Sequence, residues 1–210
     1  MKKKEIVGVL TGDIKNSSKL SNEQKSFVQS ELFNYFKDKT YVLLPLKFYR
    51  GDSFQLMVTK EKAALAALMI EAILLHVSGK FARISIGIGL ASKIKKGNVL
   101  QSEGEAFLLS GHQLDKMKEE NRLMKIALSS DLFQPILSAA FYLSECIVKG
   151  WKPGQASVLA QIPVSKTQKE IAEKLKISGA AVSKAIKTSN WSAIENFLNV
   201  YEVTLKMIYP

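Results

Sequence analysis

The sequence predicts an α+β sandwich followed by an all-helical domain. Residues 1–128 alternate strand-like and helix-like periodicity, whereas residues 130–210 have almost purely helical patterns. Hydrophobic residues make up 47% of the 210-residue chain and charged residues 23%, as in ordinary soluble globular proteins. A chain of this length has room for one medium-sized domain and a small one.

The N-terminal part is expected to form a mainly antiparallel sheet with helices over one face. Strand-like runs lie at 5–10, 42–49, 54–59, 81–91 and 123–128. Helical spacing lies at 22–37, 60–77 and 105–120. The glycine-containing polar segment 50–53 predicts a hairpin between its neighbouring runs. The order β-α-β-β-α-β-α-β fits a two-layer sandwich.

The helical part is expected to contain a connecting helix and a compact terminal unit. Asp131 is a possible start signal for the connecting helix, and the segment Gly150–Gly154 (GWKPG) predicts its end. The predicted domains are therefore residues 1–128, a connecting helix at 129–150 and a unit at 151–210.

Residues 166–187 have the pattern of a helix-turn-helix. Thr167 is expected to cap the first helix, with Glu170 completing a capping box, and Ser178 to cap the second. Lys176 stands where the turn commonly has glycine, at a modest strain cost. Ile177 is expected to plug the core of the turn.

The outward face of this pair is the candidate DNA-binding surface. The segment resembles the helix-turn-helix of many bacterial transcriptional regulators, which implies a recognition helix in the major groove of double-stranded DNA. The alternative is that two amphipathic helices pack for structural reasons only. The candidate contact residues are Lys166, Thr167, Gln168, Lys169, Ser178, Gly179, Ala180, Ser183, Lys184 and Lys187.

The charge of the chain agrees with a polyanionic partner. The formal net charge is +11, with a sequence pI near 9.6. Such a surplus suggests nucleic acid or an anionic membrane surface, or serves solubility alone, and does not choose among them. Lysines of the helical pair are placed to contact phosphates, which favours DNA.

Asp13 and Asp52 are candidate metal ligands. Asp13 follows the first predicted strand, within Thr11–Ser17 (TGDIKNS), and Asp52 lies in the predicted hairpin. If these strands are neighbours, the two carboxylates can converge and hold Mg²⁺ with a nucleotide. Alternatively, both are ordinary loop residues, because aspartate and glycine are common in turns.

These motifs resemble two related families. The element order, Asp13 and Gly51–Phe54 (GDSF) are similar to the palm of class III nucleotidyl cyclases. Over most of its length the chain resembles the SatD family of bacterial proteins, through Thr11–Ser17, Gly51–Gln55 (GDSFQ) and the C-terminal helix pair. The resemblance implies a ferredoxin-like, cyclase-like palm sandwich followed by a helix-turn-helix domain.

The chain departs from active cyclases at two positions. Those enzymes place an asparagine and an arginine on the helix that follows Gly104, and these positions fall near Leu108 and His112 here. Leucine cannot hydrogen-bond, and histidine is only partly charged at neutral pH. The groups that would stabilise a reacting phosphate are therefore missing.

We therefore expect a DNA-binding transcriptional regulator whose degenerate cyclase-like domain senses a ligand or mediates assembly. The alternative is a metal-dependent nucleotide-binding enzyme, a cyclase or nucleotidyl transferase, that carries a DNA-binding domain. A cytoplasmic location is expected, because no signal peptide or membrane-spanning stretch is visible. The single cysteine, Cys146, has apolar sequence neighbours and is expected to be buried and inert.

A homodimer is also expected from the C-terminal segment. Its apolar residues are separated by alternating steps of three and four, which is typical of a coiled-coil seam. The residues are Trp191, Ile194, Leu198, Tyr201, Leu205 and Ile208. The alternative is that the same seam packs back on its own chain.

Overall fold

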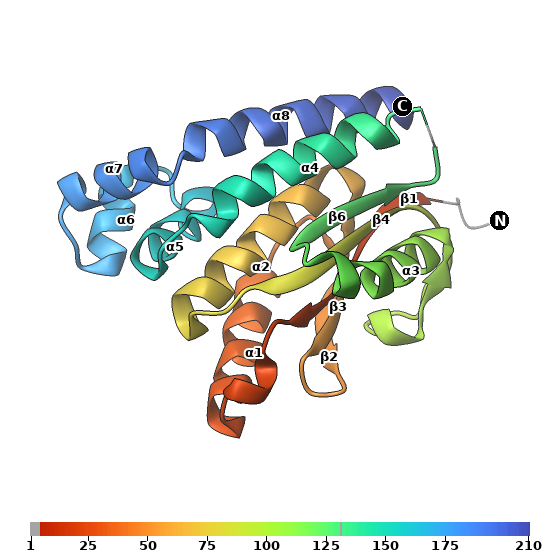
Figure 1. The fold of residues 1–210 in the computed structure, drawn as a ribbon, viewed down its shortest axis with the longest axis horizontal. Coiled ribbons are helices and arrows are strands. Elements are labelled where there is room, and N and C mark those ends of the chain that lie inside the picture. Colours follow the sequence, from red (N-terminus) through yellow and green to blue (C-terminus); the bar gives the residue numbers. More distant parts are fainter. Residues whose placement is uncertain (1–4, 131) are drawn as a thin grey trace.

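The computed structural model describes residues 5–130 and 132–210, so the start signal expected at Asp131 lies outside the described residues. Six strands form one sheet (Figure 1). They are β1 (Glu5–Ile14), β2 (Val42–Tyr49), β3 (Ser53–Thr59), β4 (Ala82–Lys93), β5 (Glu103–Gly104) and β6 (Met124–Leu128). The α-helices are α1 (Asn22–Phe36), α2 (Ala63–Ser78), α3 (Glu105–Glu120), α4 (Gln134–Lys149), α5 (Pro153–Leu159), α6 (Gln168–Leu175), α7 (Gly179–Thr188) and α8 (Trp191–Ile208).

The sheet has the strand order of a ferredoxin-like sandwich. The antiparallel neighbours run β2-β3-β1-β4-β5, and β6 adds to β4 in parallel. The segment predicted as a hairpin joins β2 to β3, with Arg50 at φ 52° and Gly51 at φ 85°. This confirms the predicted order of elements, to which the structure adds the two-residue strand β5.

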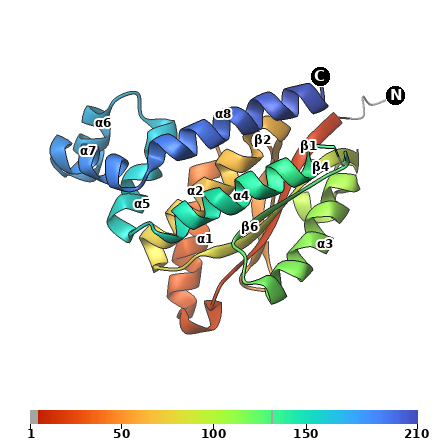
Figure 2. The ribbon, with the colours of Figure 1, turned by 45° about the horizontal axis from the view of Figure 1, so that its top comes forward.

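Helices cover both faces of the sheet, so the expectation of one covered face was wrong. Leu10 and Ile14 of β1 join the main core with α1 and α2, whereas Val7 and Val9 join a second core with Ala106 of α3. Neighbouring residues of a strand point to opposite faces, and β1 is buried on both. Figure 2 shows α3 on the side of the sheet away from α2.

The helices α4 and α8 run antiparallel along the edge of the molecule above α2 (Figures 1 and 2). Tyr201 of α8 is fully buried and its hydroxyl donates to the Lys60 carbonyl oxygen at 2.7 Å. Its ring lies 5.9 Å from the ring of Phe141 in α4. The main core therefore continues from the sheet through α2 into the C-terminal helices.

This packing overturns the predicted dimer seam. Of its six residues, Trp191, Ile194, Tyr201 and Leu205 are buried within the chain, and Leu198 and Ile208 pack against the same core. The seam is real, but it covers the chain's own apolar surface, which was the alternative. A homodimer stays a prediction and requires a different surface.

The helices α5, α6 and α7 enclose a small separate core. Ile171, Val182 and Val158 are buried together there. Ile177, expected to plug this core, is instead 39% exposed. The chain leaves α6 through Lys176 in the left-handed conformation, with φ 54°, and this turn directs the next side chain outward.

Two tryptophans close the junction between this small core and the rest of the protein. Trp151 and Trp191 are each 3% exposed, and their rings lie 6.4 Å apart. The Trp151 indole nitrogen donates to the carbonyl oxygen of Ser189 at 3.0 Å.

Two surface properties complete the description. Cys146 is exposed on α4, so the expectation of a buried thiol was wrong. Its apolar sequence neighbours alternate between the core and the surface around the helix. Among the described residues, none of the helices has the combination of length and apolar character that crossing a membrane requires.

Candidate functional site

Asp13 lies inside β1 rather than after it, since the strand continues to Ile14. In the sheet, Asp13 is opposite Ser53 of β3 on one side and Arg83 of β4 on the other. The Arg83 guanidinium donates two hydrogen bonds to the Asp13 carboxylate, from Nε to Oδ1 at 2.7 Å and from Nη2 to Oδ2 at 3.1 Å. Both oxygens of Asp13 are therefore engaged by a fixed positive charge.

Asp52 has a different partner. It follows the two left-handed residues of the hairpin, and its Oδ2 accepts a hydrogen bond from the Ser17 hydroxyl at 2.5 Å. Its backbone carbonyl accepts from the amide of Ile14 at 3.2 Å. The fold thus brings the two aspartates to neighbouring strand ends, as the sequence predicted, but each carboxylate binds a partner of its own.

Both candidate metal ligands already bind side chains of the protein in this arrangement. A cation at Asp13 would compete with a guanidinium that already bonds both oxygens. Among the described residues, no group of three or more histidine, cysteine, aspartate or glutamate side chains is arranged to hold a metal. The ion pair with Arg83 instead neutralises the charge of Asp13 within the protein.

A polar network that the sequence did not predict surrounds Asp13. The hydroxyls of Thr11 and Ser110 lie 2.8 Å apart, and the Gln55 amide donates to Thr11 Oγ1 at 3.1 Å. Burial raises the pKa of the nearby Tyr49 hydroxyl; Arg50 opposes this rise, and aspartate charges including that of Asp13 add to it. The network ties α3 to β1.

The positions where cyclases place their asparagine and arginine lie on the solvent side of α3. Leu108 is 63% exposed and His112 is exposed as well. Neither makes a hydrogen bond to the polar network among the contacts of the described residues. These two side chains therefore lie outside the polar network of the described residues.

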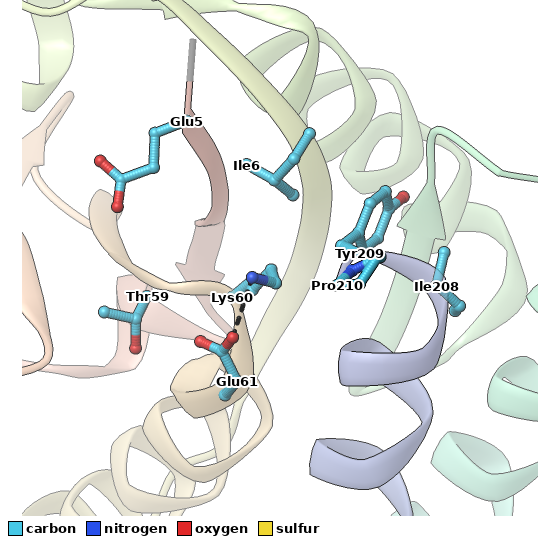
Figure 3. A pocket seen from close by; sticks show the side chains of 8 residues that line it. All are labelled: Glu5, Ile6, Thr59, Lys60, Glu61, Ile208, Tyr209 and Pro210. Atoms are coloured by element: carbon cyan, nitrogen blue, oxygen red, sulfur yellow. Dashed lines mark ion pairs between the residues drawn. The ribbon is translucent and has the colours of Figure 1, made fainter. Parts of the chain in front are cut away.

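A cavity of about 670 Å³ lies at the other end of β1 from Asp13 (Figure 3). Glu5 and Ile6 of β1 line it together with Lys60, Glu61 and Tyr209. Lys60 and Glu61 form an ion pair at 3.0 Å within it, as the dashed line marks. Neither candidate metal ligand lines this cavity.

The second candidate surface lies on α6, α7 and the segment before them. All ten residues predicted to contact DNA are exposed. Thr167 Oγ1 accepts from the Glu170 amide at 3.2 Å, and Ser178 Oγ accepts from the Ala181 amide at 3.1 Å. Both predicted caps are confirmed; the Glu170 carboxylate, however, accepts from the Lys166 amide at 2.8 Å instead of completing the capping box.

The end of α1 adds positive charge to this side of the molecule. Lys39 follows α1, and its pKa is lowered first by partial burial and then by the positive charge of Lys174 in α6. The Lys39 ammonium lies 4.9 Å from the centre of the Tyr35 ring. The sequence did not indicate this contribution, because Lys39 and Lys174 are far apart along the chain.

The chain is distantly similar to solved structures of nucleotide cyclases. No family model and no curated protein matches the chain. A structure of a bacterial light-regulated adenylyl cyclase is 15% identical, with a TM-score of 0.45, covering 59% of this chain and 76% of that one. A second such structure is 14% identical, with a TM-score of 0.45 and coverage of 60% and 43%. The guanylyl cyclase Cya2 is 14% identical, with a TM-score of 0.35 and coverage of 54% and 71%.

Proposed function

We propose that this protein is a DNA-binding regulator that contacts double-stranded DNA through α6 and α7, acting as a helix-turn-helix. The observation that carries the proposal is the division of α7 into two faces. Val182 and Ala185 are buried in the small core, while Ser183, Lys184 and Lys187 are exposed. A recognition helix needs this arrangement, since one face holds it and the other meets base edges and phosphates.

Charge and capping support the same proposal. From Lys149 onward the chain has nine lysines and four glutamates. Positively charged side chains around a helix pair give the electrostatic part of DNA binding. The Ser178 cap defines the start of α7. The first turn of α7 contains Gly179 and Ala180, which are exposed and small enough to let DNA approach closely.

The cyclase-like palm is proposed to serve as a ligand sensor or in assembly, in line with the SatD-like pairing of motifs. The competing function, a metal-dependent nucleotide enzyme, would require Asp13 to exchange Arg83 for a cation. It would also need a substitute for the exposed Leu108. The internal pairing of Asp13 therefore favours the regulator.

The test is DNA binding by the full chain. Duplexes selected from a random library are labelled, and binding is measured by fluorescence anisotropy for the wild type and for Ser183→Ala/Lys184→Ala. Loss of contacts by these two exposed residues should weaken binding by about 10-fold, because a good base contact is worth at least about 1 kcal/mol and the Lys184 charge adds a phosphate contact. Affinity should also fall steeply as salt rises.

A matched control separates local contact from overall charge. Lys96→Ala removes one positive charge from an exposed loop on another part of the chain, as Lys184→Ala does on α7. This variant should bind almost as the wild type does. Equal affinity for the wild type and the α7 variant, or no selected duplex at all, would reject the proposed role of α7.

A further inference from the structure

The outer face of α4 and α8 carries several exposed large apolar side chains. Figure 1 shows both helices along one edge of the molecule, with no described element beyond them. Large apolar side chains that project outward from the two helices and from the residues just before α4 are 51–78% exposed. They are Leu132, Ile136, Leu143, Val200, Val203 and Met207.

A groove marks where the two helices meet on this face. It has a volume of about 300 Å³. Leu143 and Ile147 line it from α4, and Phe197 and Val200 line it from α8. This surface is distinct from the inner seam of α8, because Val200, Val203 and Met207 lie on the opposite side of the helix from Ile194 and Leu205, which are buried.

The face carries no exposed charge along α4 before the last residue of the helix, Lys149. The one charged residue between Gln134 and Val148 is Glu145, which is fully buried and bonded to Arg122 at 2.9 Å. On α8, Glu202 pairs with Lys62, and the exposed Lys206 borders the apolar row beside Met207 near the end of the helix. In a chain with 30 lysines and arginines, an uncharged strip of this length is a marked departure from the rest of the surface.

The dimensions of the face fit a weak interface. The 16 residues of α4 span about 24 Å at about 1.5 Å per residue. Helices packed side by side have axes about 8–10 Å apart and are each about 10 Å wide, so the two-helix face is about 18–20 Å across and covers roughly 400 Å² in projection. Two copies would then bury roughly 800 Å² in projection, below the about 1,000 Å² of a stable specific contact, so a dimer through this face is weak and depends on concentration.

We propose that this α4–α8 face binds a second copy of the same chain, forming a two-fold symmetric dimer with a four-helix contact. An uncharged apolar face is complementary to itself, which is what an isologous interface requires. Two chains of net charge +11 repel each other, and a face almost without lysines is where that repulsion and the desolvation of charge are smallest. The inference does not depend on DNA binding.

The single cysteine provides a direct probe. Cys146 is exposed on α4, one turn from Leu143, and the two thiols approach each other in a dimer whose two-fold axis passes beside this turn of α4. A short bismaleimide should therefore convert the full-length wild type into a covalent dimer. The variant Cys146→Ser should give none.

Sedimentation velocity at protein concentrations of about 1–100 µM tests the oligomeric state without a cross-linker, since dimerisation follows mass action. The wild type should shift from monomer toward dimer, and Leu143→Lys/Val200→Lys should remain monomeric and folded, because both side chains are exposed. The control Phe27→Lys/Phe33→Lys adds the same charge at exposed apolar positions of α1 and should dimerise as the wild type does.

Two outcomes would overturn the proposal. One is a wild type that stays monomeric throughout and is not cross-linked through Cys146. The other is a Leu143→Lys/Val200→Lys variant that dimerises normally, which would locate the contact elsewhere. If a monomeric wild type instead floats with vesicles of phosphatidylglycerol and phosphatidylcholine, and the double variant does not, the face binds a membrane surface rather than a second copy.

Discussion

Replacing Glu71 by glutamine should remove a pH-dependent loss of stability. The Glu71 side chain is fully buried in α2; its Oε2 accepts from the Ala82 amide at 2.9 Å, and its Oε1 has no partner among the described residues. Burial raises the pKa of this carboxyl well above its usual value of 4.5, and the charge of Glu145 adds to the rise. The folded protein therefore keeps Glu71 protonated at pH values where the unfolded chain has ionised it.

The sign and the size follow from this difference. Above pH 4.5 the unfolded state binds fewer protons than the folded state, so the free energy of unfolding falls as pH rises toward the folded pKa. For one group the largest slope is about 1.4 kcal/mol per pH unit. Glu71→Gln has almost the same shape and cannot ionise, so its stability should lack this contribution.

Urea unfolding from about pH 5 to about pH 8 measures the effect. The stability of the variant relative to the wild type should increase with pH over this range. The exposed substitution Glu119→Gln is the control and should follow the wild type. If the free energy of unfolding changes with pH in the same way for Glu71→Gln and the wild type, burial does not hold this carboxyl neutral.

Three further outcomes are expected. Gly87→Ala should destabilise the fold by about 1–3 kcal/mol or more in urea, because its Cβ would lie 2.1 Å from the carbonyl oxygen of Ala106; unchanged stability would contradict this close approach. Lys176→Gly should stabilise the protein by up to about 1–2 kcal/mol, since it relieves a left-handed backbone at a non-glycine residue, and a lower melting temperature would argue against it. In calorimetric titrations with Mn²⁺, neither the wild type nor Asp13→Asn/Asp52→Asn should show binding. A binding isotherm seen only with the wild type would reveal a metal site.

Local patterns allowed much of the fold to be predicted. The strand from Val42 to Tyr49 has the predicted bounds, because alternation and the following hairpin residues are signals within a few positions of each other. The same holds for the caps Thr167 and Ser178 and for the left-handed turn at Lys176. In each case the physical cause is contained in the neighbouring residues.

The candidate site could be predicted only in part, because its decisive contacts are long-range. Arg83 lies 70 residues from Asp13, and no local pattern indicates that β4 would pair with β1 in this register. Periodicity likewise identified the apolar inner face of α8 but not what covers it. The core that Tyr201 enters is built by α2 and α4, and a repeat of three and four has the same form whether its partner is another chain or the same one.

The neighbouring side chains Trp151 and Trp191 give the protein an intrinsic fluorescent reporter. These are the chain's two tryptophans, and both are buried where α5–α7 join the body of the molecule. Nearly all indole emission therefore comes from this one joint. Any event that loosens the joint should shift the emission to the red and separate the coupled rings, so movement of the α5–α7 unit can be followed without attaching a dye.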